Sequence, residues 1–77
     1  MKDVAADAFA VVSPRNEIDV RTVSETPRAA MANAIHLYLT PVTSDWSDDS
    51  ISTAFSELRR RGVRLCRVSV QLQEQVQ

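Results

Sequence analysis

Few side chains in this sequence could take part in catalysis. His36 is the only histidine and Cys66 the only cysteine among 77 residues, and Gly62 is the only glycine. A histidine can act as a general base and a cysteine as a nucleophile, but only within an oriented constellation of partner groups. No nucleophile-elbow or triad spacing surrounds Cys66 or the serines, and phosphate-binding loops need several glycines. We therefore predict that the protein is not an enzyme and uses no cofactor.

Structural roles account for His36 and Cys66. His36 falls on the polar side of a predicted helix, where it is expected at the surface. Cys66 falls among apolar residues of a predicted strand, where a thiol behaves as a small buried hydrophobe. A lone cysteine forms no disulfide within the chain and supplies too few thiolates for a tetrahedral zinc site. These features predict no metal site and a reducing, cytoplasmic setting.

Arginine dominates the basic residues and gathers near the C-terminal end. Guanidinium groups make planar, bidentate contacts with carboxylates and phosphates, and arginine and tryptophan are enriched at interface hot spots. One interpretation is therefore an anionic partner; the other is that these arginines only complement a helix C-terminus and a solvated strand face. Acidic residues at Asp45, Asp48 and Asp49 leave the same choice open. The candidate partner-binding residues are Arg21, Trp46, Arg59, Arg60, Arg61, Arg64 and Arg67.

Three segments have the pattern of β-strands. Residues 8–13 form a short apolar run, and residues 18–23 alternate apolar and polar side chains. Residues 13–17 between them carry a turn signal, because Pro14 presets φ and Asn16 tolerates the left-handed conformation. A hairpin is therefore predicted there. A third strand is predicted over residues 63–72, followed by a frayed tail at 73–77.

Two segments have the pattern of amphipathic helices. The first is predicted from the N-cap Thr26 to residue 39, with Pro27 at its first position and Pro41 as the stop. Its expected buried stripe contains Ala30, Met31, Ala34, Ile35, Leu37 and Tyr38, and Arg28, Asn33 and His36 are expected to face away.

The second helix has the strongest local signature. Ser47 is its predicted N-cap, Asp48 begins an acidic first turn, and Gly62 follows three arginines that favour a helix C-terminus. Trp46, just before the cap, is predicted to pack on Ile51 as a hydrophobic staple. The apolar stripe of this helix contains Ile51, Ala54, Phe55 and Leu58.

The order β-β-α-α-β predicts an α+β fold, a two-layer sandwich in which two helices cover one face of a three-stranded sheet. All 77 residues form one domain, with an ordered core over residues 8–72. Strand order stays open: the third strand runs antiparallel to the second, or parallel to a central first strand. The uncovered sheet face would be mostly polar, with Asp19, Arg21, Arg67, Ser69 and Gln71 as candidates.

Neither a secretion signal nor a membrane span is predicted. Asp3 and Asp7 interrupt the apolar run near the N-terminus before it reaches the length of a signal sequence. No segment approaches the roughly 18 continuous apolar residues that a membrane-spanning helix needs. A net charge of −1 and an isoelectric point of about 5.7 argue against a general nucleic-acid binder.

The stretches AVVSP at 10–14 and VRTVSETPRAA at 20–30, closed by GVR at 62–64, resemble small orphan proteins of bacteriophages and mobile elements. The resemblance is one of size and style and covers residues 8–72. Some such proteins are anti-CRISPR inhibitors, which bind a host interference complex and block DNA recognition or nuclease recruitment. It implies a host protein or ribonucleoprotein partner in a bacterial cytoplasm. It carries over no functional residue, because such inhibitors share no common site, and the near-neutral charge differs from acidic DNA-mimicking members.

The leading hypothesis is a small non-enzymatic inhibitor of a host defence complex that acts by protein contact. One alternative is a nucleic-acid-binding regulator that lays its arginines against phosphates, in which case binding must weaken steeply with salt. Another is an accessory subunit that self-associates along a strand edge as a homodimer.

Overall fold

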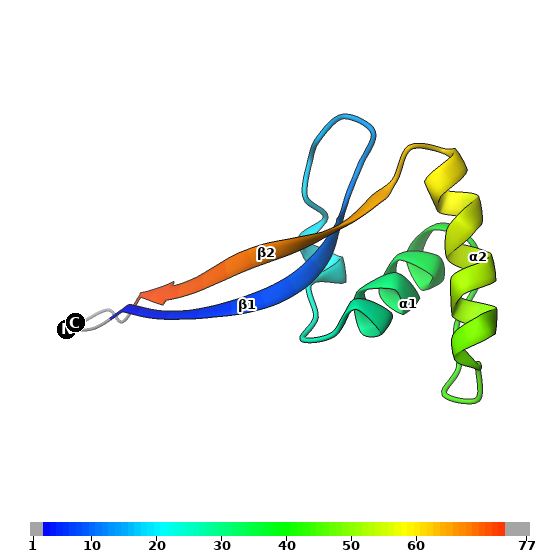
Figure 1. Cartoon of the computed structure of the whole chain (residues 1–77), viewed down its shortest axis with the longest axis horizontal. Coiled ribbons are helices and arrows are strands. Elements are labelled where there is room, and N and C mark those ends of the chain that lie inside the picture. The colour runs from blue at the N-terminus through cyan, green and yellow to red at the C-terminus, as the bar shows by residue number, and fades with distance from the viewer. Residues whose placement is uncertain (1–2, 74–77) are drawn as a thin grey trace.

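A computed structural model describes the backbone of residues 3–73 and the side chains of residues 7–69. The chain is elongated, with principal extents of 44 × 30 × 18 Å. Figure 1 shows a two-stranded ribbon that extends away from a pair of helices, with residues 3 and 73 at its far end. The elements in chain order are β1 (Asp3–Val12), the 3₁₀ helix η1 (Val20–Thr22), α1 (Pro27–Tyr38), α2 (Asp48–Arg60) and β2 (Arg64–Gln73).

The ribbon is antiparallel and joins the two ends of the described chain. The register runs without a break from Asp3 opposite Gln73 to Val12 opposite Arg64. β1 begins five residues before the predicted start of the first strand, and β2 is within one residue of its predicted bounds. Of the tail predicted to fray at residues 73–77, only Gln73 is described, and it belongs to β2; residues 74–77 lie outside the described residues.

The predicted three-stranded sheet is wrong, because the structure has a two-stranded sheet of β1 and β2. Residues 18–24 form no ladder with β1. Ile18 and Ser24 make isolated bridges to Val12 and Phe9. Single hydrogen bonds also join Asp19 and Thr22 to Val11. Between these bridges the chain turns into η1, because the carboxylate of Asp19 accepts a hydrogen bond from the backbone N–H of Arg21 at 3.0 Å. Asp19 and Arg21 therefore do not lie on a sheet face.

Both predicted strand orders are also wrong. The last strand pairs with the first strand, antiparallel to it, and not with residues 18–23. Of the predicted open face, Arg67 and Ser69 do lie on β2, while the side chain of Gln71 lies outside the description.

The predicted turn at residues 13–17 is confirmed. Asn16 N–H bonds to the carbonyl of Ser13 and Ser13 N–H bonds to the carbonyl of Glu17, each at 2.9 Å. Asn16 has a φ of 64°, the left-handed conformation that asparagine tolerates. The turn therefore forms as expected, although the strand expected after it does not.

Thr22 makes a hydrogen bond to β1 that the predicted second strand would have made. Its side-chain oxygen accepts a hydrogen bond from Val11 N–H at 2.9 Å and donates one to the carbonyl of Asp19 at 2.7 Å. Thr22 is fully buried, so these groups have no access to water. The hydroxyl thus supplies the acceptor that a neighbouring strand would have offered to β1.

Local signals position both helices. The side chains of Thr26 and Ser47 accept hydrogen bonds from Ala29 N–H and Ser50 N–H, which confirms both N-caps. Gly62 ends the second helix region at a φ of 92°, and a Cβ there would come within 3.1 Å of the Pro14 ring. Glycine is therefore required at this position by both conformation and space.

The helices and the proximal end of the ribbon form one core. Its buried members are Val11, Ala34, Ile35, Ile51, Phe55 and Leu58. The stripe predicted for α1 is partly wrong, because Leu37 and Tyr38 are 40% and 43% exposed. Asn33, predicted to face away, is half-buried and donates a hydrogen bond to Ser24 Oγ at 2.8 Å.

Replacing Thr22 by valine tests the role of the hydroxyl. Thr22→Val keeps the shape but leaves Val11 N–H without its acceptor, so we expect unfolding to become easier by about 1–3 kcal/mol. Hydrogen exchange of the Val11 amide should accelerate in Thr22→Val and stay slow in Thr22→Ser, which keeps the hydroxyl. Equal protection of that amide in both variants would contradict the assignment.

Candidate functional site

The predicted arginine cluster is not one surface. Arg59 and Arg60 lie at the end of α2 and Arg61 caps it, whereas Arg64 and Arg67 lie on β2. Residues three apart on a strand point to opposite faces, so Arg64 and Arg67 are separated by the ribbon itself.

Most of these arginines already have partners within the protein. The guanidinium of Arg59 lies over the Phe55 ring at 5.1 Å from its centroid, and that of Arg67 over the Phe9 ring at 5.7 Å. Arg60 pairs with Glu57 at 3.2 Å, and Arg64 donates a hydrogen bond to Asn16. These arginines therefore contact other residues of the protein. Their close spacing in the sequence does not correspond to one cluster in space.

Trp46, also a predicted contact residue, serves the fold. It is half-buried and packs against the core that contains Ile51. Its carbonyl accepts a hydrogen bond from Arg28 at 2.8 Å, and Arg28 also pairs with Asp48. This arrangement fits the predicted hydrophobic staple better than an exposed anchor.

A polar cluster that the sequence did not predict joins η1 to the end of α1. Arg21 donates to both carboxylate oxygens of Asp19, at 3.1 and 3.0 Å, and the Tyr38 hydroxyl also donates to that carboxylate. Arg21 further donates to the Tyr38 oxygen at 3.1 Å. The hydrogen bonds from Arg21 hold the pKa of Asp19 below its usual value, although burial acts in the opposite direction. The cluster fixes the ring of Tyr38 beside the loop.

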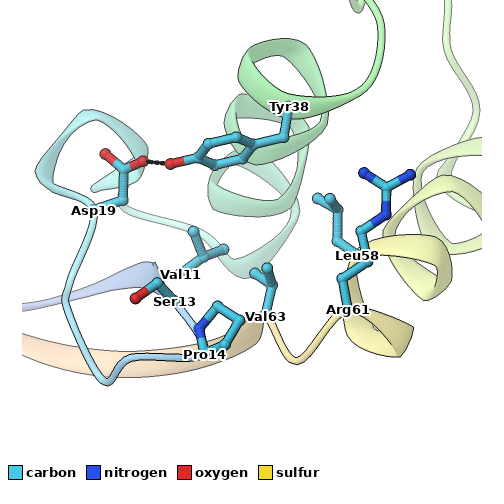
Figure 2. Close-up of a pocket in the computed structure, with 8 residues that line it drawn as sticks. All are labelled: Val11, Ser13, Pro14, Asp19, Tyr38, Leu58, Arg61 and Val63. Atoms are coloured by element: carbon cyan, nitrogen blue, oxygen red, sulfur yellow. Dashed lines mark hydrogen bonds between the residues drawn. The ribbon is translucent and has the colours of Figure 1, made fainter.

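An apolar hollow of about 300 Å³ lies beside this cluster. Figure 2 shows Tyr38 and Asp19 on one side of the hollow and Arg61 on the other. Within the described residues, no hydrogen bond or ion pair engages the guanidinium of Arg61. Between these groups the walls are apolar and consist of Val11, Pro14, Leu58 and Val63, with Ser13 at the edge.

A second hollow of about 390 Å³ adjoins the first and shares Ser13, Asp19 and Tyr38 with it. Ile18 and Val20 line this second hollow and are 53% and 77% exposed. Arg15 and Glu17 complete its lining. We call the residues that line the two hollows, together with Arg21, the Tyr38 surface.

The composition of the Tyr38 surface suits protein binding. Exposed apolar side chains gathered around concave walls mark sites of interaction, whereas isolated ones need no explanation. Tyrosine and arginine beside such hollows are the residue types that anchor interfaces. Of the predicted contact residues, Arg61 lines the Tyr38 surface and Arg21 supports it; Trp46, Arg59, Arg60, Arg64 and Arg67 are not among its lining residues.

His36 and Cys66 are placed apart from this surface. His36 is exposed, as predicted, but its Nδ1 also accepts a hydrogen bond from Val42 N–H at 3.1 Å and so holds the turn after α1. Cys66 was expected to be buried, but it is only half-buried, at the position opposite Ala10. Among the side chains of residues 7–69, no three His, Cys, Asp or Glu residues come together as metal ligands would. Neither α1 nor α2 has the length and apolar character needed to cross a bilayer.

The Asp19–Arg21 pair should make stability depend on pH. Because the folded-state pKa of Asp19 is lowered, its contribution is complete above the unfolded value of about 3.9 and is lost as the pH falls through the lower folded value. We expect Asp19→Asn to be less stable than the parent at pH 7 and to lose less stability between pH 4 and pH 2. Urea unfolding across this range measures the effect. The exposed control Asp7→Asn should retain the parent's pH dependence, and an unaltered slope in Asp19→Asn would contradict the role of the pair.

Comparisons of this chain with protein-family models, with curated protein sequences and with solved structures found no match.

Proposed function

We propose that this chain is a small non-enzymatic protein that binds another protein through the Tyr38 surface. The observation that carries the proposal is the pair of adjoining hollows with exposed apolar residues around them. Ile18, Val20 and Tyr38 are 53%, 77% and 43% exposed and lie together along the second hollow. Covering them would remove apolar area from water, which is the main favourable term in protein association.

The charges favour a partner segment that combines an apolar side chain with a carboxylate. Arg21 compensates the charge of Asp19 within the cluster, so Asp19 does not make the first hollow strongly anionic. Arg61 stands across the hollow from that pair (Figure 2). An apolar side chain can enter the first hollow against Pro14 and Val63, its more exposed apolar walls, while a neighbouring carboxylate takes a bidentate contact from Arg61.

The finer hypothesis is that the bound protein belongs to a host defence complex. It rests on the resemblance to small phage-encoded inhibitors and on the presence of a docking surface on a very small domain. A steric inhibitor needs only such a surface, because occupying the partner's site is sufficient to block it.

Binding assays on purified CRISPR effector complexes test both levels of this proposal. We expect co-elution in size exclusion with at least one complex, and a loss of affinity of about tenfold or more for Arg61→Glu and for Val20→Asp. Arg60→Glu is the matched control for the first variant, because it makes the same charge change at a neighbouring exposed residue outside the hollows. Thr53→Asp on α2 is the control for the second.

Two outcomes would each overturn one part of this proposal. Separate elution from every complex removes the inhibitor hypothesis. A bound complex whose affinity falls equally in Arg60→Glu and Arg61→Glu, and not in Val20→Asp, removes the Tyr38 surface as the contact.

The nucleic-acid-binding alternative has less support, because the arginines are divided between the end of α2 and the two faces of the ribbon, and most of them contact other residues of the fold. We expect no mobility shift of duplex DNA or RNA at low salt. A shift that weakens with a log–log salt slope of several ions would contradict this expectation and favour phosphate binding.

A further inference from the structure

The outer edge of β2 is a second unpartnered feature, distinct from the Tyr38 surface. β2 pairs with β1 along one edge only. Among the described residues, its backbone makes no hydrogen bond outside that ladder. In Figure 1 the ribbon extends well beyond the helices. Two-stranded ribbons are marginally stable on their own in water, whereas three or more strands give independent stability.

The hydrogen bonds of β1 identify which groups of β2 point outward. Phe9 exchanges bonds with Ser24 at 2.8 and 2.9 Å, so its N–H and C=O point away from β2. In an antiparallel ladder the residue opposite such a position also points its groups away from the pair. Phe9 lies opposite Arg67. The outward N–H and C=O groups of β2 therefore belong to Leu65, Arg67, Ser69, Gln71 and Gln73.

The two edges of the ribbon differ in how they are protected. The β1 edge is covered near the helices, where residues 18–24 bond to Phe9 and Val11. β2 has no such cover, and it contains no proline or lysine. Its register with β1 has no bulge. Natural edge strands use such features, and charged side chains, to prevent pairing with another chain. β2 carries two charges, on Arg64 and Arg67, and both lie in its half nearest the helices. The rest of its edge, from residue 68 to residue 73, has none of these features and is open to a further strand.

We propose that this edge pairs with β2 of a second copy of the chain, around a two-fold axis at Ser69. An isologous contact of this kind needs no second surface, because one edge supplies both sides. Pairing centred on Ser69 sets outward groups against outward groups, from Leu65 opposite Gln73 to Gln73 opposite Leu65.

The residue types at the paired positions are compatible with a second copy. Arg67 falls opposite Gln71, so no like charges face each other. Val68 falls opposite Val70, and Cys66 opposite Leu72, so apolar types meet apolar types. The net charge of −1 gives little repulsion between copies. The product is a four-stranded sheet in the order β1-β2-β2-β1, in which each ribbon gains the neighbours that it lacks alone.

The mass in solution and two substitutions at the axis test the proposal. The chain of 8.6 kDa should sediment as a dimer, and Ser69→Pro should sediment as a monomer because it removes an outward N–H. This proline spares the β1–β2 ladder, which does not use that N–H. Ser69→Lys should also dissociate the dimer, because two lysines would then face each other at the axis. Ser52→Lys makes the same charge change on exposed α2 surface and should remain dimeric.

A cross-link tests the register. In a Cys66→Ser background, Ser69→Cys places two thiols on directly opposed residues, whose Cα atoms are about 5.5 Å apart in such a pair and within disulfide range. Oxidised glutathione should then convert the dimer to a covalent one, with Ser52→Cys in the same background as the control.

Three results would overturn the proposal: a monomeric parent at millimolar concentration, a dimer that persists in Ser69→Pro and Ser69→Lys, or cross-linking no faster at residue 69 than at residue 52. Circular dichroism confirms that each variant is folded. Binding through the Tyr38 surface is measured separately, so either proposal can fail without the other.

Discussion

The hydrogen bond from Val11 N–H to the hydroxyl of Thr22 is the interaction on which the arrangement of this molecule depends. It gives the buried N–H of Val11 a hydrogen-bond acceptor at an edge of β1 that has no neighbouring strand. Because Thr22 also bonds to the carbonyl of Asp19, it fixes the turn that presents Asp19 to Tyr38. The proposed docking surface thus follows from the way in which one hydroxyl replaces a strand.

The elements that the sequence predicted correctly are those determined by neighbouring residues. Thr26 and Ser47 cap their own helices, Asn16 takes the left-handed turn conformation, and Gly62 ends the region of α2. Each of these signals acts within a few residues along the chain, so the sequence pattern contains the whole cause.

The strand predicted at residues 18–23 failed because its alternation has a competing explanation. Asp19 bonds to the backbone two residues on, which favours a tight turn over an extended chain. Ile18 and Val20 then become exposed, and the apolar side chains that suggested a sheet face instead line a hollow. The partners of Arg67 and Arg64 could not be predicted for a related reason, since Phe9 and Asn16 are distant from them in sequence.

The pairing of β1 with β2 also has a kinetic consequence. The innermost pair, Val12 with Arg64, closes a loop that contains every other element. Closing so long a loop costs conformational entropy before any hydrogen bond between β1 and β2 can form. Folding also slows as the contacts of the native state become more distant in sequence. The helices form from local contacts, so the ribbon should be assembled last, and the native state becomes accessible only after β2 has been synthesised.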